Sequence, residues 1–227
     1  MKVNVCAPIT ALTCEEALEL LRRAEERQAD LIEFRLDYLN QNARIDDLIS
    51  ATKLPKIATN RPAGEGGEFK GKEEDRLQSL LGAAEAGCEF VDVELAANDV
   101  RNIIKKTHKI GAQAIVSHHD SRSTPDTQRL DRILRKQMSV GADICKIVLT
   151  AKKFSDNLRI LEFVSNSSKK TKIVSFAMGK LGVISRVMSP IYGASFTFAS
   201  VERGTESAAG QLTLEEIKGV YRLMRLE

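Results

Sequence analysis

One lysine stands inside an apolar run and is the residue whose type and setting best suit covalent chemistry. Lys146 lies between Ile144 and Val148 in the segment 144–150. A lysine in such surroundings loses hydration, and desolvation lowers its pKa. A neutral amine in a carbonyl-binding pocket is a nucleophile that forms a Schiff base. Lys146 is therefore a candidate nucleophile; the alternative is an edge lysine whose ammonium reaches solvent.

Charged residues also occupy alternate positions in two other apolar segments, 31–37 and 89–95. Side chains of a strand alternate between its two faces, so these charges share the face opposite the apolar residues. Burying them costs several kcal/mol per ion before pairing compensates. They either neutralise one another in the core or line a functional site, and we favour the site. The charged residues are Glu33, Arg35, Asp37, Asp92 and Glu94.

Further polar residues follow other apolar segments. Arg61 comes directly after 56–60, and His118 and His119 come at the end of the segment beginning at Gln113. Adjacent residues of a strand point to opposite sides, so only one of the two histidines can face a shared site. The surrounding apolar pattern does not choose between them. A histidine in this position is suited to proton transfer near neutral pH.

The elements that must position these residues follow a regular rhythm of short β-branched runs and longer helical patterns. Thr13 and Thr213, each followed by two glutamates, predict helix starts, and Gly87, Gly111 and Gly141 predict helix ends. The predicted strands are 3–7, 31–37, 56–60, 89–95, 113–118, 144–150, 172–178 and 194–200. The predicted helices are 14–29, 43–52, 73–86, 98–110, 126–140, 155–168, 180–189 and 213–226.

Strands that alternate with helices predict parallel pairing through crossover connections. Eight such units predict a compact α/β fold of the (β/α)₈ TIM-barrel class, with residues 1–227 as one catalytic domain. An open doubly wound sheet is the alternative, but no GxGxxG turn follows the first predicted strand. Helices cover the outside of a barrel, so the charged faces must point inward. Active sites of this fold lie at the carboxyl ends of the strands, where the polar residues are.

Composition excludes several classes of function. The 34 Lys and Arg residues nearly balance the 31 Asp and Glu residues, giving a net charge of +3. This balance argues against a nucleic-acid or membrane-surface partner. No apolar run reaches the ~18 residues of a membrane span. The first residues lack the apolar core of a signal peptide. The four cysteines are scattered, with no metal-ligand spacing, so we expect reduced thiols, no metal site and a cytoplasmic protein.

Two loops are expected over the site. Residues 61–72 contain four glycines without the order of a phosphate-binding loop, and residues 200–211 are rich in Gly, Ala, Ser and Thr. Small residues and this length are typical of a lid that orders when substrate binds. The alternative is ordinary mobile surface.

Taken together, these motifs resemble type I 3-dehydroquinate dehydratase, the Schiff-base enzyme family of the shikimate pathway. The resemblance runs from the first predicted strand to the last predicted helix, and six motifs occur in order. The motifs are Glu33-Phe-Arg35-Leu-Asp37, Arg61-Pro-Ala-Gly-Glu65-Gly-Gly, Asp92-Val-Glu94, Ser117-His-His119-Asp120 with the Lys146 strand, Met178-Gly-Lys-Leu-Gly-Val-Ile-Ser-Arg186 and Ser207-Ala-Ala-Gly-Gln211.

The resemblance implies a (β/α)₈ barrel that converts 3-dehydroquinate to 3-dehydroshikimate by syn elimination, without a cofactor, as a homodimer. It implies that Lys146 forms the imine and that His119, rather than His118, is the acid and base. It also implies that Glu65 orients that histidine. The residues that the resemblance places on the substrate are Glu33, Arg35, Arg61, Arg186, Ser207 and Gln211.

Two alternatives remain open. Another class I Schiff-base barrel, such as an aldolase or transaldolase, would share the strand lysine but would usually bind a phosphorylated sugar. A non-catalytic barrel that binds a carboxylic acid would keep the pocket and lose nothing measurable when Lys146 is replaced.

Overall fold

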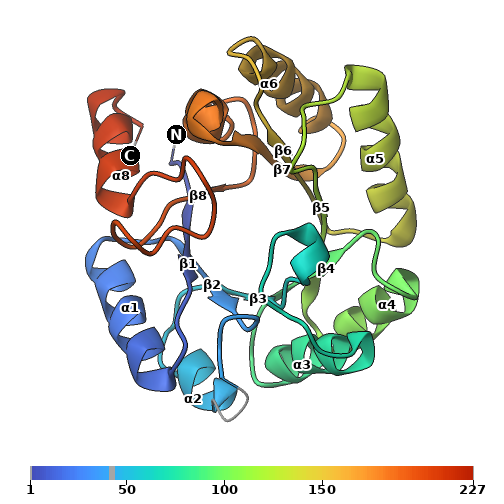
Figure 1. Ribbon diagram of the computed structural model, residues 1–227, viewed down its shortest axis with the longest axis vertical. Coiled ribbons are helices and arrows are strands. Elements are labelled where there is room, and N and C mark those ends of the chain that lie inside the picture. The colour runs from blue at the N-terminus through green and yellow to red at the C-terminus, as the bar shows by residue number, and fades with distance from the viewer. Residues whose placement is uncertain (1, 41–43, 227) are drawn as a thin grey trace.

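Eight parallel strands form the centre of the molecule and eight α-helices surround them, as the computed structural model shows for residues 2–40 and 44–226 (Figure 1). The strands follow the order β7-β6-β5-β4-β3-β2-β1-β8. Just before β8, Ser195 N donates to Ile173 O of β7 at 2.8 Å, which brings the two ends of the sheet together. The prediction of a (β/α)₈ barrel is confirmed.

The strands agree closely with the predicted segments, except the first strand, which begins and ends two residues later than predicted, and the last, which is shorter. Three strands extend over seven residues each, and β8 is only two residues long. The strands are β1 (Val5–Ile9), β2 (Leu31–Arg35), β3 (Lys56–Thr59), β4 (Phe90–Glu94), β5 (Gln113–His119), β6 (Ile144–Thr150), β7 (Lys172–Met178) and β8 (Thr197–Phe198).

The helices also lie where periodicity predicts them. The predicted helix 43–52 is shorter in the structure, and its residue 43 falls outside the described residues. The α-helices are α1 (Cys14–Glu26), α2 (Ile45–Ser50), α3 (Glu73–Glu85), α4 (Val100–Ile110), α5 (Thr127–Val140), α6 (Asp156–Ser167), α7 (Val183–Met188) and α8 (Leu214–Leu223). Two 3₁₀ turns, η1 (Ala63–Glu65) and η2 (Lys180–Gly182), lie in the loops that follow β3 and β7.

Local sequence explains where the helices begin and end. Thr13 and Thr213 each accept a hydrogen bond from the backbone N–H three residues later. The glutamate at that position accepts one from the backbone N–H of the threonine, which completes a capping box. Gly111 and Gly141 end α4 and α5 in the left-handed conformation that glycine adopts without strain. These predicted signals are confirmed.

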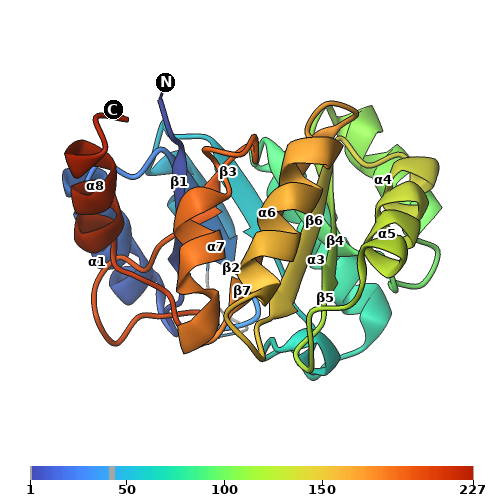
Figure 2. The ribbon, with the colours of Figure 1, turned by 90° about the horizontal axis from the view of Figure 1, so that it is seen from above.

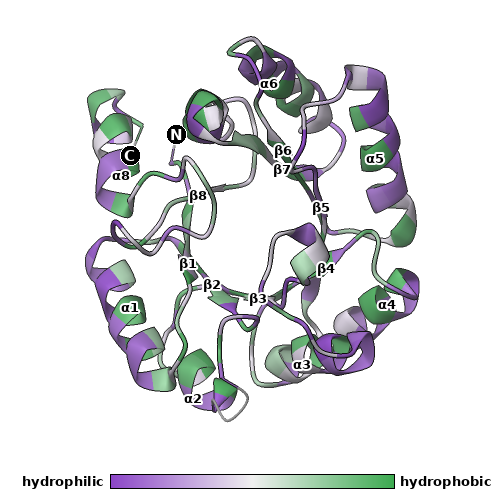
Figure 3. Ribbon diagram, viewed as in Figure 1, coloured by the Kyte–Doolittle hydropathy of each residue, from purple (hydrophilic) through white to green (hydrophobic). Residues whose placement is uncertain are grey.

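The hydrophobic core has two parts, one on each face of the strands, as the alternation of side chains along a strand requires. In β6, Cys145, Ile147 and Leu149 pack outward against the helices, whereas Ile144 and Val148 belong to the cluster inside the barrel. The helices stand around the strands and carry both hydrophobic and hydrophilic residues along their length (Figures 2 and 3). Lys146 thus shares the interior face with two apolar neighbours, and its charge must be compensated inside the barrel.

Candidate active site

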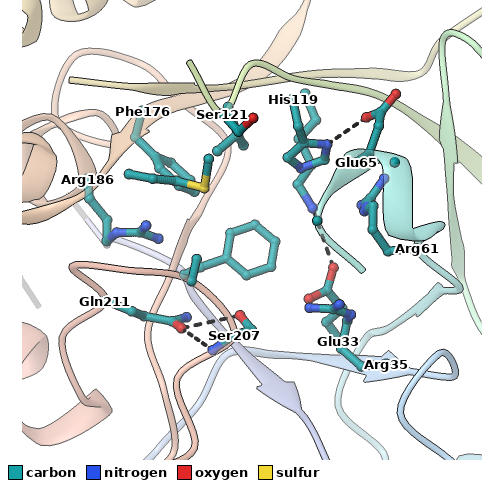
Figure 4. A pocket seen from close by; sticks show the side chains of 17 residues that line it. Glu33, Arg35, Arg61, Glu65, His119, Ser121, Phe176, Arg186, Ser207 and Gln211 are labelled. Atoms are coloured by element: carbon teal, nitrogen blue, oxygen red, sulfur yellow. Dashed lines mark hydrogen bonds and ion pairs between the residues drawn. The ribbon is translucent and has the colours of Figure 1, made fainter. Parts of the chain in front are cut away.

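A cavity of about 230 Å³ opens where the strands end, and all nine predicted site residues line it (Figure 4). Its walls come from β2, β5, β6, β7 and β8, from α7, and from the loops that follow β3, β5 and β8. The lining residues are Glu33, Arg35, Arg61, Gly64, Glu65, Gly66, His119, Ser121, Lys146, Val148, Phe176, Met178, Arg186, Phe198, Ser207, Ala208 and Gln211.

Lys146 is held between two carboxylates and an aromatic ring. Its Nζ donates to Asp92 Oδ2 at 2.8 Å and to Glu33 Oε1 at 3.4 Å. The same nitrogen lies 4.5 Å from the centre of the Phe198 ring. The side chain is 6% exposed, so its free end can be reached only from the cavity. These contacts fix the amine at one place on the cavity wall.

Arg61 organises the carboxylates around the lysine. Its Nη2 pairs with Asp92 Oδ2 at 2.8 Å, and its Nη1 donates to Glu94 Oε1 at 2.5 Å and to Ser117 Oγ at 2.7 Å. Burial alone would raise the pKa of Asp92, but Arg61 and Lys146 beside it lower that pKa well below its usual range. Asp92 therefore stays ionised, and the guanidinium of Arg61 is largely occupied by protein groups.

His119 and Glu65 form a hydrogen-bonded pair across the cavity from Arg186 (Figure 4). His119 Nδ1 lies 2.9 Å from Glu65 Oε2. The η1 turn places Glu65 there, and Gly67 permits the tight loop that follows, because a Cβ at this position would lie 2.0 Å from Arg61 O. An ionised Glu65 fixes the proton on Nδ1 and leaves Nε2 as the basic nitrogen of the ring.

The surroundings shift the pKa of both members of this pair. Burial raises the pKa of the Glu65 carboxyl to about 7, although Arg61 opposes it. Burial also lowers the pKa of His119 well below its usual value, and the cations Arg61 and Lys146 act in the same direction. The imidazole is therefore neutral at pH 7 while the carboxyl titrates. Such a pair can take up a proton and return it near neutral pH.

Arg186 is a buried cation that pairs with no carboxylate among the described residues. Its side chain stacks on Phe176, with Cζ 4.2 Å from the ring centre. Nε and Nη2 find no hydrogen-bond acceptor among residues 2–40 and 44–226. Burial lowers the pKa of this guanidinium to about 10, so it remains charged at neutral pH. An unpaired planar cation on a cavity wall fits a carboxylate ligand.

The loop after β8 contributes an amide to the same wall. Gln211 Oε1 accepts from the backbone N and the Oγ of Ser207, at 2.8 and 3.2 Å. Its buried Nε2 has no acceptor in the described part of the chain. The loop is tied to the barrel where Gly179 N donates to Ala209 O. Gly210, at φ +75°, passes so close to the barrel that a Cβ at this position would lie 2.4 Å from Gly179 O. Closure of this loop on a ligand stays a prediction.

Arg35 is the third arginine that lines the cavity, beside Arg61 and Arg186. It makes two hydrogen bonds to Asp37, at 2.9 and 2.7 Å, and its Cζ lies 4.7 Å from the Tyr38 ring. Asp37 also accepts from Glu68 N at 3.0 Å, so it links β2 to the loop that carries Glu65.

Some lining residues were not predicted from the sequence. Val148, Phe176, Met178 and Phe198 form the apolar part of the wall, and Ser121 follows the histidine motif. Period-two alternation from Lys146 would have found Val148, whereas Ser121 lies in a loop with no periodic signal. His118 does not line the cavity; its buried Nε2 has no partner within the described chain. Residues 2–40 and 44–226 contain no group of three His, Cys, Asp or Glu side chains that could hold a metal ion.

Comparison with known proteins agrees with this arrangement. Residues 5–227 match the family model for type I 3-dehydroquinase. The 3-dehydroquinate dehydratase of Dehalococcoides mccartyi is 34% identical over 223 residues, covering 98% of this chain and 96% of that protein. Its counterpart in Methanocaldococcus jannaschii is 34% identical over 225 residues, covering 98% and 100%. The crystal structure of type I 3-dehydroquinate dehydratase from Clostridium difficile, with covalently modified comenic acid, superimposes with a TM-score of 0.90 at 26% identity. It covers 98% of this chain and 92% of that chain.

Proposed function

Because the chain belongs to the type I 3-dehydroquinase family, we propose that Lys146 and His119 carry out the dehydration of 3-dehydroquinate in the cavity described above. The chain is a hydro-lyase of the shikimate pathway, and its reaction removes water from 3-dehydroquinate to give 3-dehydroshikimate. One observation supports the assignment most strongly. The amine of Lys146, the His119–Glu65 pair and the unpaired Arg186 guanidinium all face one cavity.

The first step is attack of the Lys146 amine on the ketone carbon, after the nitrogen gives up the proton through which it pairs with Asp92 and Glu33. A carbon–nitrogen bond forms, and the ketone oxygen leaves as water after receiving protons from the cavity. Asp92 and Glu33 hold Nζ at the wall, so the amine meets the carbonyl in one orientation. The protonated imine then withdraws electrons from the adjacent carbon and acidifies its C–H bond.

The second step is proton transfer by His119. Nε2 takes the proton from the carbon next to the imine, and the electron pair moves to the nitrogen as an enamine. The enamine expels the hydroxyl on the following carbon, and His119 returns its proton to that oxygen, so water departs. One residue can do both because the elimination is syn. Water then hydrolyses the conjugated imine and frees Lys146. The net change is loss of one water.

All but one of the predicted binding residues are assigned to the substrate. Arg186 supplies the cation for the carboxylate, and its unpaired Nε and Nη2 can donate two parallel hydrogen bonds. Gln211 Nε2 is available for a hydroxyl or a carboxylate oxygen. Arg35, Ser207 and Glu33 complete the polar wall. Arg61 is engaged by Asp92, Glu94 and Ser117, so we assign it to holding the carboxylates rather than to a direct substrate contact.

Borohydride trapping tests this proposal. The protein is incubated with 3-dehydroquinate and borohydride, and intact mass and peptide mapping locate any adduct. We expect an adduct of ligand size on the peptide that contains Lys146, and none in Lys146→Ala. The absence of an adduct in folded protein would refute the imine mechanism. An adduct formed with a sugar phosphate, but not with 3-dehydroquinate, would favour an aldolase-like reaction instead.

We also propose that residues 1–227 act as one catalytic domain in a cytoplasmic homodimer. Strands from both ends of the chain pair with each other, because β1 lies beside β8. Four exposed apolar side chains gather where α6 begins beside η2 and α7, a surface suited to a second copy. These side chains are Phe154, Leu158, Leu181 and Ile184. The cysteines in the described chain are unpaired thiols, as in a reducing compartment.

Light scattering and localisation test this assembly. We expect a dimer mass for the unmodified protein and a monomer for Leu158→Glu, with Leu223→Glu, an exposed leucine on α8, as the control. A tagged chain should be found in the cytoplasm. In the described residues, no helix has both the length and the apolar character needed to cross a membrane.

A further inference from the structure

Charged side chains of alternating sign run from helix α3 into the cavity. The cavity end of this series is Asp92 and Lys146, and its outer end is Glu73, whose side chain is 27% exposed. Between them lie Arg76, Glu94 and Arg61, all buried. Each member contacts the next at hydrogen-bond distance. In order, the series is Glu73, Arg76, Glu94, Arg61, Asp92 and Lys146.

Arg76 is a buried member of the series to which the proposed reaction gives no role. It projects from α3 and is 1% exposed, although it belongs to a helix on the outside of the barrel. Its Nη1 lies 2.7 Å from Glu94 Oε2 and donates to Asn60 O at 2.7 Å. Its Nε and Nη2 donate to the two carboxylate oxygens of Glu73, at 2.7 and 2.8 Å. Burial of a guanidinium at this depth needs a reason beyond helix packing.

Because of this contact, the two carboxylate oxygens of Glu94 have different arginine partners. Arg76 neutralises Glu94 at Oε2, and Arg61 contacts only Oε1. Arg61 is therefore free to use Nη2 for Asp92, the carboxylate that holds Lys146. Without Arg76, Glu94 would carry a negative charge shared with a single arginine.

The acid–base pair lies within reach of this charge. The charged and titratable groups that act on Glu65 or His119 come from the loop after β3 and from β4, β5 and β6. They are Arg61, Asp92, Glu94, His118 and Lys146. The carboxylates of Glu94 and Asp92 raise the pKa of Glu65, whereas Arg61 lowers it. An extra uncompensated negative charge on β4 would make both Glu65 and His119 harder to deprotonate.

We propose that Arg76 is a positioning residue that sets the protonation of the Glu65–His119 pair by neutralising Glu94. It touches neither substrate nor the reacting atoms. This inference rests on the proposed function, because it needs Glu65 and His119 to be the pair that limits catalysis at low pH.

The test is the pH dependence of kcat/KM, followed by the ultraviolet absorbance of the conjugated product from about pH 5 to 9. In wild type, activity rises with pH as the pair loses its proton. We expect Arg76→Met to move the midpoint of this rise upward by about one pH unit, the size of the effect of one unit charge at roughly 10 Å. Glu94→Gln should move it downward by a similar amount.

Matched variants separate charge from structure. The double variant Arg76→Met/Glu94→Gln removes both charges and should return the midpoint to the wild-type value, and Arg76→Lys should keep it there. Equal midpoints in all variants, with only a uniform loss of activity, would overturn the proposal. If Arg76→Met does not fold, the comparison of Glu94→Gln with the double variant decides the question. An inactive wild type that traps no adduct would refute the proposed function instead.

Discussion

Replacing Arg186 with methionine should raise the free energy of unfolding of the ligand-free protein and also raise KM for the substrate. The guanidinium is 1% exposed, and its pKa is lowered to about 10 by burial. Against an ordinary value of about 12.5, this corresponds to roughly 3 kcal/mol lost in keeping the charge buried. Stacking on Phe176 returns about 0.5–2 kcal/mol. Methionine fills a similar volume without charge, so we expect a gain of about 1–3 kcal/mol.

The catalytic effect has the opposite sign. A carboxylate on Arg186 would receive two charge-assisted hydrogen bonds, each worth about 1.5–3 kcal/mol. Their loss should raise KM by about 10²- to 10⁴-fold. Urea unfolding at pH 7 measures the stability, and steady-state kinetics measure KM.

Arg61 provides the matched control, because it is a second buried arginine in the same cavity. Its guanidinium is paired with Asp92 and Glu94, so Arg61→Met leaves two buried carboxylates with fewer partners. We expect a loss of about 3–5 kcal/mol. A ligand-free Arg186→Met protein that is less stable than wild type by more than about 1 kcal/mol would refute the reasoning. So would a KM within tenfold of wild type.

Three further predictions follow from other parts of the molecule. Lys146→Ala should lower kcat by more than about 10³-fold and abolish the borohydride adduct, as mass spectrometry and kinetics will show. In wild type the rise of kcat/KM should have its midpoint near the Glu65 pKa of about 7; in Glu65→Gln the rise should move to lower pH, because only His119 then titrates and its pKa lies well below the usual value. Thr213→Ala removes one half of a capping box and should cost about 1 kcal/mol in urea unfolding without changing kcat.

The fold was predictable from sequence wherever alternation and caps were strong, and less so at the neighbouring strands β1 and β8. β1 runs two residues further than predicted, because Pro8 does not end it. Asn4 O and Cys6 O accept hydrogen bonds from the β8 side, so the next residue on that side is Pro8. β8 has ended by then, so the missing N–H of Pro8 interrupts no ladder.

The last strand shows the reverse error. The run 194–200 predicts seven residues of strand, yet only Thr197–Phe198 pair as one. Backbone hydrogen bonds on either side of these two residues are made to segments other than β1. Ser195 N donates to Ile173 O, and Ser200 N donates to Leu212 O. Apolar composition reports burial, and burial does not require a continuous ladder.

The site depended on contacts that no local pattern contains. Alternation placed Lys146 and the charges of β2 and β4 on one face, but it left His118 and His119 undecided. The resemblance pointed to His119 with Glu65 as its partner. The tertiary structure shows the two side chains in contact and His118 Nε2 buried away from the cavity. Arg76 carried no signal, because an arginine on an outer helix normally reaches solvent.

The pairing of charges inside the barrel explains how the interior can hold several ions and still bind an anionic substrate. Arg35 is paired with Asp37, and Arg61 is paired with Asp92 and Glu94. The positive charges on these strands are thus compensated before substrate arrives. Arg186 lies apart from this network, against an aromatic ring. An anionic substrate therefore gains most at Arg186, which fixes its carboxylate at one end of the cavity and leaves its ketone to meet Lys146.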